Sequence, residues 1–256
     1  MSWAARRQFL YAAGVILFFA IVIGGPIGYK IITKPPTCSD GIQNQGETSI
    51  DKGGPCPLVD ESKLAPSSVV WSRSFRVRSG SYNAVALIQN PNQNIGIRQI
   101  SYKFGLYDEQ NLLIAERSGS IYIMPGAITP IFEGAIDAGN RVVAHTYFDF
   151  TSAPSWEKLG NAASPLEISN VDISDVSTMP RVTAQVKDTS VESLSAMTFV
   201  AIVYDPAGNA FAASQTTLQA LAAGATADLI FTWPAPFNIT VGRIQVIPLV
   251  APVALQ

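Results

Sequence analysis

The feature that most constrains the fold of this chain is a spaced duplication centred on two Tyr-Asp pairs. Residues 104–108 read Phe-Gly-Leu-Tyr-Asp, and residues 201–205 read Ala-Ile-Val-Tyr-Asp. The flanking positions keep step with an offset of 97 to 98 residues, as in Asn90 and Asp188, Tyr107 and Tyr204, and Gly126 and Gly224. A repeat of this length, made of short apolar runs and turns, has the size of a β-sandwich domain.

Both copies alternate apolar and polar residues with a period of two, which is typical of strands that bury one face. The apolar positions are Tyr82, Ala84, Ala86, Ile88, Ile100, Tyr102, Phe104 and Leu106 in the first copy, and Val182, Ala184, Val186, Met197, Phe199, Ala201 and Val203 in the second. We therefore predict an all-β protein with two tandem β-sandwiches, at residues 67–151 and 166–256, joined by a linker at 152–165.

The N-terminal segment has the length and composition of a membrane span. Residues 9–29 carry no charge, and as a helix they would extend about 31 Å, close to the thickness of a bilayer core. A cleaved signal peptide is the alternative, because two arginines precede the apolar run. The run is longer than usual for a signal peptide. We therefore expect a cytoplasmic tail at residues 1–8 and a single transmembrane anchor in the lipid bilayer at residues 9–33.

The chain has two cysteines, Cys38 and Cys56, in a stretch rich in Gly, Asp and Asn just beyond the anchor. A cysteine pair in an irregular segment without its own core indicates a disulfide and an oxidising compartment. Closing a loop of this length contributes about 3 kcal/mol in the chain-entropy model. We therefore expect residues 34–66 to be a disulfide-closed linker, extracytoplasmic like all that follows, with the amino terminus in the cytoplasm of a cell membrane.

This stretch resembles a short cysteine module of bacterial surface proteins, with the pattern Cys-x-Asp-Gly-x-x-Asn-x-x-Glu-x-x-x-Asp-Cys-Gly-Gly-x-Cys. It departs from the module at Lys52, where a cysteine is expected, and no fourth cysteine follows. Carboxylate and amide oxygens are also ligands that Ca²⁺ prefers, whereas the same residue types commonly build turns. Calcium is the one cofactor left open, and its candidate ligands are Asp40, Asn44, Glu47 and Asp51.

Residues 104–108 spell the pattern of the FxLYD family, and the Asn-terminated strand, the Tyr-Asp turn and the Gly-led hairpin also look like that family. The resemblance covers roughly residues 68–150 and, with Ala201 in place of Phe, residues 166–250. It implies immunoglobulin-like sandwiches in a membrane-anchored or exported protein, and it supplies no catalytic residues. Structural roles in packing and turn formation are expected for Phe104, Leu106, Tyr107, Asp108, Val203, Tyr204 and Asp205.

The composition argues against catalysis and against nucleic-acid binding. The net charge is −2, and the sequence shows no Lys/Arg stripe of the kind that tracks a phosphate backbone. His145 is the one histidine, and no nucleophile with its base is evident. We expect no enzyme activity and no small-molecule substrate. Core or interface packing is expected for the three tryptophans that follow the anchor, Trp71, Trp156 and Trp233.

These observations predict a non-catalytic, membrane-anchored scaffold or protein-interaction module of a prokaryotic cell envelope. Its partner would be another envelope protein or a surface polymer. One alternative is a structural subunit of a larger membrane assembly that uses the anchor helix as its interface, because Gly24, Gly25 and Gly28 would let helices approach closely. A weaker alternative is a calcium-dependent envelope sensor that works through the loop at residues 38–56.

Overall fold

The computed structural model describes residues 3–32, 38–159 and 165–251. The chain divides into two compact units, Met1–Cys56 and Pro57–Gln256. The first unit contains α1 (Trp3–Ile32), whose stretch Gln8–Lys30 is long and apolar enough to cross a membrane. This agrees with the expected anchor, although a long signal sequence near the amino terminus would meet the same criteria.

The second unit is built from antiparallel strands, with one short 3-10 helix (Glu61–Lys63) before them. Each strand pairs only with antiparallel neighbours among the described residues. The strands are β1 (Ser68–Arg78), β2 (Ser81–Gln89), β3 (Ile95–Tyr107), β4 (Leu113–Ile123), β5 (Ile128–Asp137), β6 (His145–Phe150), β7 (Glu157–Lys158), β8 (Leu166–Ser174), β9 (Arg181–Asp188), β10 (Leu194–Tyr204), β11 (Ala210–Leu221), β12 (Thr226–Thr232) and β13 (Arg243–Leu249).

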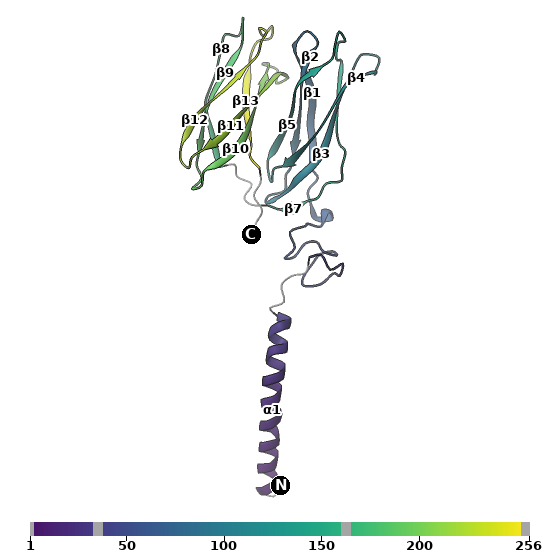
Figure 1. The fold of residues 1–256 in the computed structure, drawn as a ribbon, viewed down its shortest axis with the longest axis vertical. Helices are drawn as coiled ribbons and strands as arrows, with labels where there is room; N and C mark the ends of the chain where they lie inside the picture. The colour runs from purple at the N-terminus through teal and green to yellow at the C-terminus, as the bar shows by residue number, and fades with distance from the viewer. Residues whose placement is uncertain (1–2, 33–37, 160–164, 252–256) are drawn as a thin grey trace. The chain divides into compact units, whose positions relative to one another are not determined.

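The strands form four sheets that associate in two pairs. The first sheet pair consists of β1-β2-β5 and β4-β3-β6, with β7 also beside β3; the second consists of β12-β9-β8 and β11-β10-β13. When β1 to β6 are matched in order with β8 to β13, both pairs have the same strand order. The sheets lie face to face (Figure 1), and each pair encloses its own apolar core.

The two cores contain the inward positions that the sequence period predicts. Phe104 and Ile88 are fully buried in the first sheet pair, and Phe199 and Val186 are fully buried in the second. Two of the tryptophans also lie in the cores, Trp156 in the first and Trp233 in the second, which confirms their expected packing role. The alternating runs therefore identify the strands that carry most of each core.

A third apolar cluster joins the two sheet pairs. It forms where the outward face of β1 and β2 meets the outward face of the sheet β11-β10-β13, and Figure 1 shows these sheets side by side. Both β2 and β10 are consequently buried on both faces. The buried residues of this cluster are Phe75, Val85, Leu87, Val200, Ile202, Tyr204, Ala210, Ala213 and Ile247.

The apolar character of this contact is specified position by position. At four positions, the face that meets the other sheet pair carries an apolar side chain, whereas the matching position of the other copy carries a polar side chain or glycine. The matched positions, at the offset of 97 to 98 residues, are Val85 and Thr183, Leu87 and Gln185, Val200 and Lys103, and Ile202 and Gly105. The contact between the sheet pairs is therefore encoded separately from the cores.

The alternating runs named from the sequence lie in β2, β3, β9 and β10, and the sequence period predicts no strand at β1, β4, β7, β8 or β11. In β1, Trp71 and Phe75 point outward into the third cluster, so apolar residues no longer mark the inward face alone. In β11, the buried positions near its start are alanines such as Ala212, which give little hydropathy contrast. The period fails where a strand packs on both faces or fills its core side with small residues.

The expected linker at residues 152–165 is only partly a connection. Its described residues include β7, which pairs with Ile95 and Gly96 of β3. Trp156 and Leu159 are buried, so this stretch belongs structurally to the first sheet pair. Residues 160–164 lie outside the described residues.

Asn90, which follows β2, and Asp188, which ends β9, are both buried, but their side chains differ in how many hydrogen bonds they form. The Asn90 amide Nδ2 donates to the carbonyl oxygens of Ile95 at 2.7 Å and Met124 at 3.0 Å. Asp188 occupies the matching position and is fully buried. Its Oδ1 accepts from the Ser190 amide at 2.7 Å, but its Oδ2 has no partner among the described residues. A buried carboxylate oxygen without a donor is destabilising.

We expect the exchange of these two residues to have opposite effects on stability. Asp188→Asn should raise the free energy of unfolding by about 1 kcal/mol, because an amide can donate where the carboxylate cannot. Asn90→Asp should lower it by about 2 kcal/mol or more, because it sets a carboxylate against two carbonyl oxygens. Urea unfolding of the full chain in detergent, followed by tryptophan fluorescence, measures both changes. Equal losses of stability in the two variants would contradict this account.

A second pair of substitutions tests the contact between the sheet pairs. Val85→Thr should destabilise the chain by about 1–2 kcal/mol, because it buries a hydroxyl without a partner. The matched control, Thr183→Val, changes a half-buried position outside the third cluster, and its effect should stay within about 0.5 kcal/mol. The same urea experiment applies, and a neutral Val85→Thr would show that the contact contributes little.

Candidate functional site

The loop at residues 38–56 is closed by a disulfide between Cys38 and Cys56, as the sequence predicts. Its four candidate calcium ligands lie in this loop, but most of their oxygens accept backbone N–H groups. Both carboxylate oxygens of Asp51 accept from the Gly41 amide, and Oδ1 also accepts from the Asp40 amide at 3.0 Å. Oε2 of Glu47 accepts from the amides of Asn44 and Asp51, both at 3.2 Å.

These hydrogen bonds are those of a loop that uses carboxylates to hold its turns. Asp40 fits the same pattern, since its Oδ1 accepts from the Ile42 amide and its Oδ2 from Asn44 Nδ2. The oxygen Oδ1 of Asn44 is buried and has no partner among the described residues. The geometry thus supports the turn-forming interpretation of these residues, and the calcium interpretation remains a prediction.

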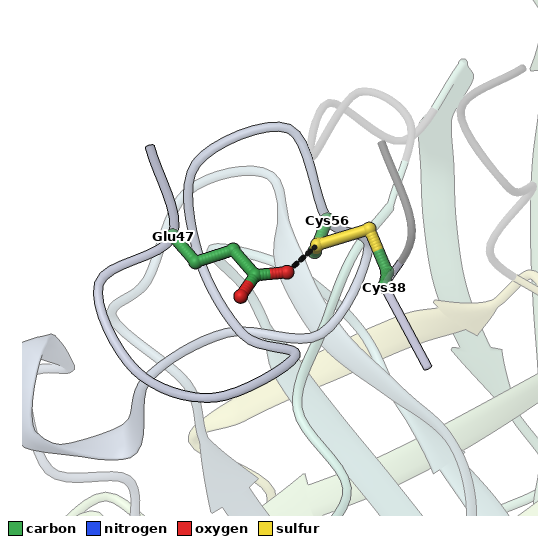
Figure 2. Close-up of side chains that lie close together, drawn as sticks. All are labelled: Cys38, Glu47 and Cys56. Carbon is green, nitrogen blue, oxygen red and sulfur yellow. Dashed lines mark hydrogen bonds between the residues drawn. A yellow bond between two sulfur atoms is a disulfide. The ribbon is translucent and has the colours of Figure 1, made fainter. Parts of the chain in front are cut away.

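Glu47 is the most buried acidic residue of the loop and lies against the disulfide (Figure 2). Its side chain is 8% exposed, and its Oε1 is 3.1 Å from Cys56 Sγ. The ligand atoms of Cys38, Glu47 and Cys56 lie within 4.8 Å of one another. Because the two sulfurs are bonded to each other, they are not thiolates and do not offer a metal site in this state.

We expect the disulfide, and not calcium, to keep this loop closed. Limited proteolysis between residues 38 and 56 should be at least about tenfold faster in Cys56→Ser than in the native chain, because the loop-closing bond is lost. Adding a calcium chelator to the native chain should leave the rate unchanged. Protection by added calcium that Asp51→Asn abolishes would instead establish a calcium site. Mass spectrometry of the cleavage products measures each rate.

The two Tyr-Asp motifs form the same turn. After β3, the Asp108 carboxylate accepts from the amides of Leu112 at 2.8 Å and Gln110 at 3.1 Å, and it also pairs with Arg141. After β10, the Asp205 carboxylate accepts from the Asn209 amide at 2.7 Å. The Leu112 amide first, and then Arg141, hold the pKa of Asp108 below its ordinary value.

Hydrogen bonds from Asn209, first from its backbone amide and then from its side chain, likewise lower the pKa of Asp205. Phe104 and Leu106 are fully buried in the first core, and Val203 is fully buried in the second. The structural roles expected for these residues therefore agree with the turns and the cores that they form.

The tyrosines of the two motifs differ in their surroundings. The Tyr107 ring lies over Gly105, where an added Cβ would come within 2.7 Å of the ring, and it makes an edge-to-face contact with Tyr147. Tyr204 does not lie in the core of the second sheet pair. It belongs to the cluster between the sheet pairs, and its hydroxyl donates to Gln245 at 3.1 Å. The matching position to Gly105 is Ile202, whose side chain is buried in the same cluster as Tyr204.

An open groove of about 650 Å³ lies where the first sheet pair meets the start of β11. Three segments that are distant in the sequence line it. β1 contributes Ser72 to Arg76, the start of β6 and the two residues before it contribute Val143 to Tyr147, and β11 contributes Ala210 and Phe211. We call this the seam groove.

An aromatic hollow of about 180 Å³ continues the seam groove along β1. The two share Phe75, Arg76 and Phe211. Trp233 and Phe237 also line the hollow, and the Phe237 ring makes edge-to-face contacts with both Trp233 and Phe211. The groove and the hollow are therefore neighbours along β1, and the depression that they make up has a polar part and an aromatic part.

The seam groove is cationic. Arg73, Arg76 and His145 line it, and neither it nor the hollow has an aspartate or glutamate among its lining residues. Within the described part of the chain, neither arginine forms an ion pair with a carboxylate. Arg73 Nη1 donates to the Ala210 carbonyl at 3.3 Å, which holds this arginine across the boundary between the sheet pairs.

A further arginine, Arg243, lies beside Tyr204, which is the β10 partner of the groove residue Ala210. The Arg243 guanidinium sits 4.2 Å from the centre of the Tyr204 ring. Burial raises the pKa of Tyr204, while the positive charges of Arg243 and then Arg73 act in the opposite direction. The seam groove itself combines two arginines, Arg73 and Arg76, with the one histidine of the chain.

Sequence reasoning missed this site. It found no Lys/Arg stripe and assigned His145 to an ordinary strand position, where it is indeed exposed in β6. The available signal was the group Arg73, Arg76 and Arg78 within a single strand that contains no acidic residue. Its importance appears only when β6 and β11 are brought beside β1.

No protein-family model matches the chain, and no curated protein matches it. Among solved structures, a β-glucuronidase from Bacteroides uniformis aligns at a TM-score of 0.20 and 14% identity, over 68% of this chain and 22% of that one. B. uniformis β-glucuronidase 2, bound covalently to cyclophellitol-6-carboxylate aziridine, aligns at a TM-score of 0.19 and 13% identity, over 68% of this chain and 22% of that one. The 7S globulin of Momordica charantia aligns at a TM-score of 0.12 and 8% identity, over 72% of this chain and 82% of that one.

The chain thus spans less than a quarter of the length of the glucuronidases that it matches. TM-scores this low carry no inference about fold, ligand or activity.

Proposed function

We propose that this chain is a non-catalytic, membrane-anchored scaffold or interaction module that displays two β domains outside the cytoplasm of a prokaryotic cell. The observation that carries the proposal is the disulfide Cys38–Cys56, formed close after a helix with the length and composition of a membrane span. Disulfides persist in oxidising compartments. The helix would hold the chain in the membrane, and the bridge would place the rest of the chain on its outer side.

We propose further that the two sheet pairs are tandem immunoglobulin-like sandwiches of the FxLYD type. Their identical strand order and their identically built Tyr-Asp turns support a duplication. In this fold, loops and sheet faces present binding residues on a rigid framework. A scaffold of this kind needs no catalytic group, and its partner would be another envelope protein or a surface polymer.

A structural subunit of a larger membrane assembly is the second candidate. It is favoured by the three small residues Gly24, Gly25 and Gly28, which lie close together in the second half of α1. Small residues let a second helix approach closely in a membrane. Photo-crosslinkers placed at residues 9–29 would capture a partner in this case, whereas crosslinkers on the outward sheet faces would capture the partner of a display module.

We expect protease added to intact spheroplasts to remove everything beyond about residue 34 while leaving the amino terminus protected. Non-reducing mass spectrometry should show a single cross-link between Cys38 and Cys56. Two free thiols, or a carboxy-terminal part protected from protease, would contradict the proposed location. The amino-terminal sequence of the mature chain separates an anchor from a cleaved signal peptide.

A further inference from the structure

We infer that the seam groove binds a linear anionic polysaccharide, with its arginines on the acidic groups and Tyr147 on a sugar ring. This inference rests on the proposed location outside the cytoplasm, where such polymers occur, and it deepens the proposed role by naming the partner. Four features of the groove support it: unpaired positive charge, hydroxyl groups, an exposed aromatic ring and length.

The positive charge in the groove is not neutralised by the chain itself. Arg76 lies at the junction of the seam groove and the aromatic hollow, and its side chain is exposed. The carboxylates nearest in sequence to β1 are outside both cavities. A chain with a net charge of −2 has concentrated unpaired arginines in one depression. Guanidinium groups bind carboxylate, sulfate or phosphate in bidentate fashion, which makes an anionic ligand the natural complement.

Hydroxyl groups line the seam groove together with its arginines. Ser72 Oγ donates to the Thr146 carbonyl at 3.3 Å, and Thr146 Oγ1 donates to Ser74 Oγ at 2.8 Å. Within this pair of hydroxyls, one hydrogen has no acceptor among the described residues. A sugar, which carries several hydroxyl groups that both donate and accept, can complete such a network.

Tyr147 presents an aromatic face at the rim of the groove. Its side chain is 59% exposed, and its orientation is held by the edge-to-face contact with Tyr107 at 5.1 Å. An exposed tyrosine supplies rigid contact area at a low cost in conformational entropy. The C–H groups on one face of a pyranose ring pack well on such a surface, and a simple inorganic anion would make no use of it.

The length of the depression indicates a polymer. It follows β1 from Ser72 to Val77, a distance of about 17 Å at the usual rise of about 3.3 Å per strand residue. A single small anion would leave most of it empty. Several linked sugar units would fill it and reach from the arginines to Phe211 and Trp233.

An acidic peptide is the competing ligand, and the strand arrangement argues against it. A bound peptide commonly pairs with an open strand edge. Beside the groove, the side of β1 that faces β6 is bridged by the Ser72, Ser74 and Thr146 hydrogen bonds. These bridges occupy the place where an added strand would pair, so side-chain recognition of a sugar polymer suits the groove better.

The test uses the full chain in nanodiscs of phosphatidylcholine, with binding followed by biolayer interferometry. The probes are polygalacturonate for carboxylate groups, dextran sulfate for sulfate groups, neutral dextran, and poly-L-glutamate for an acidic peptide. At least one of the two anionic polysaccharides should bind, neutral dextran should not, and binding should weaken as salt screens the charges. A comparison of polygalacturonate with dextran sulfate shows which acidic group the groove prefers.

Three variants connect the binding to the groove. Arg76→Gln should weaken polysaccharide binding about tenfold, the loss of one charge-assisted contact. Tyr147→Ala should weaken it about fivefold and leave any poly-L-glutamate binding unchanged, because only a sugar stacks on the ring. Arg117→Gln is the matched control: Arg117 is exposed on β4, forms no ion pair among the described residues, and lies outside both cavities.

The inference is overturned if neither anionic polysaccharide binds, or if Arg76→Gln and Arg117→Gln weaken binding equally. Tighter binding of poly-L-glutamate than of either polysaccharide would also overturn it and assign the groove to an acidic protein partner. A failure here would leave the protease protection and the disulfide cross-link of the spheroplast experiment unchanged. The proposal about the ligand and the proposal about the location can therefore be disproved independently.

Discussion

The contact between the outward faces of β2 and β10 is the interaction on which the rest of the second unit depends. Val85 and Ile202 are both fully buried in it. Because each of these strands already packs a core on its other side, the contact joins two separate cores through strands that have no solvent-exposed face. It also fixes β11 beside β1, and this placement creates the seam groove. The groove would not exist in either sheet pair alone.

Much of the fold follows from the sequence because each core obeys a simple period. The runs that end at Asn90 and Asp188 alternate cleanly, and the Tyr-Asp turns after β3 and β10 use the carboxylate chemistry that the residues suggest. The alternation does not predict strands such as β1, because Phe75 makes an outward apolar contact. Tyr204 was correctly expected to be buried, but its burial depends on the other sheet pair, which no local pattern encodes.

The candidate site was much less predictable than the fold. The disulfide could be inferred because the two cysteines are close in the sequence, and the loop carboxylates could be grouped for the same reason. The seam groove draws Arg76, Tyr147 and Phe211 from three distant segments. Each is unremarkable in its own strand. Only the register of β3 with β6 and the packing of β1 against β11 bring them together.

The asymmetry of the contact also bears on whether a further sheet pair could stack in the same way. The contact joins two different faces, and a face-to-tail arrangement of this kind continues indefinitely when each new copy offers the same faces again. The matching faces at the two ends carry Lys103, paired with Glu116, on one side and Thr183 and Gln185 on the other. These polar side chains would lose their hydration in any further stacking. At these positions the two outer faces therefore oppose a further contact of the kind that joins β2 and β10.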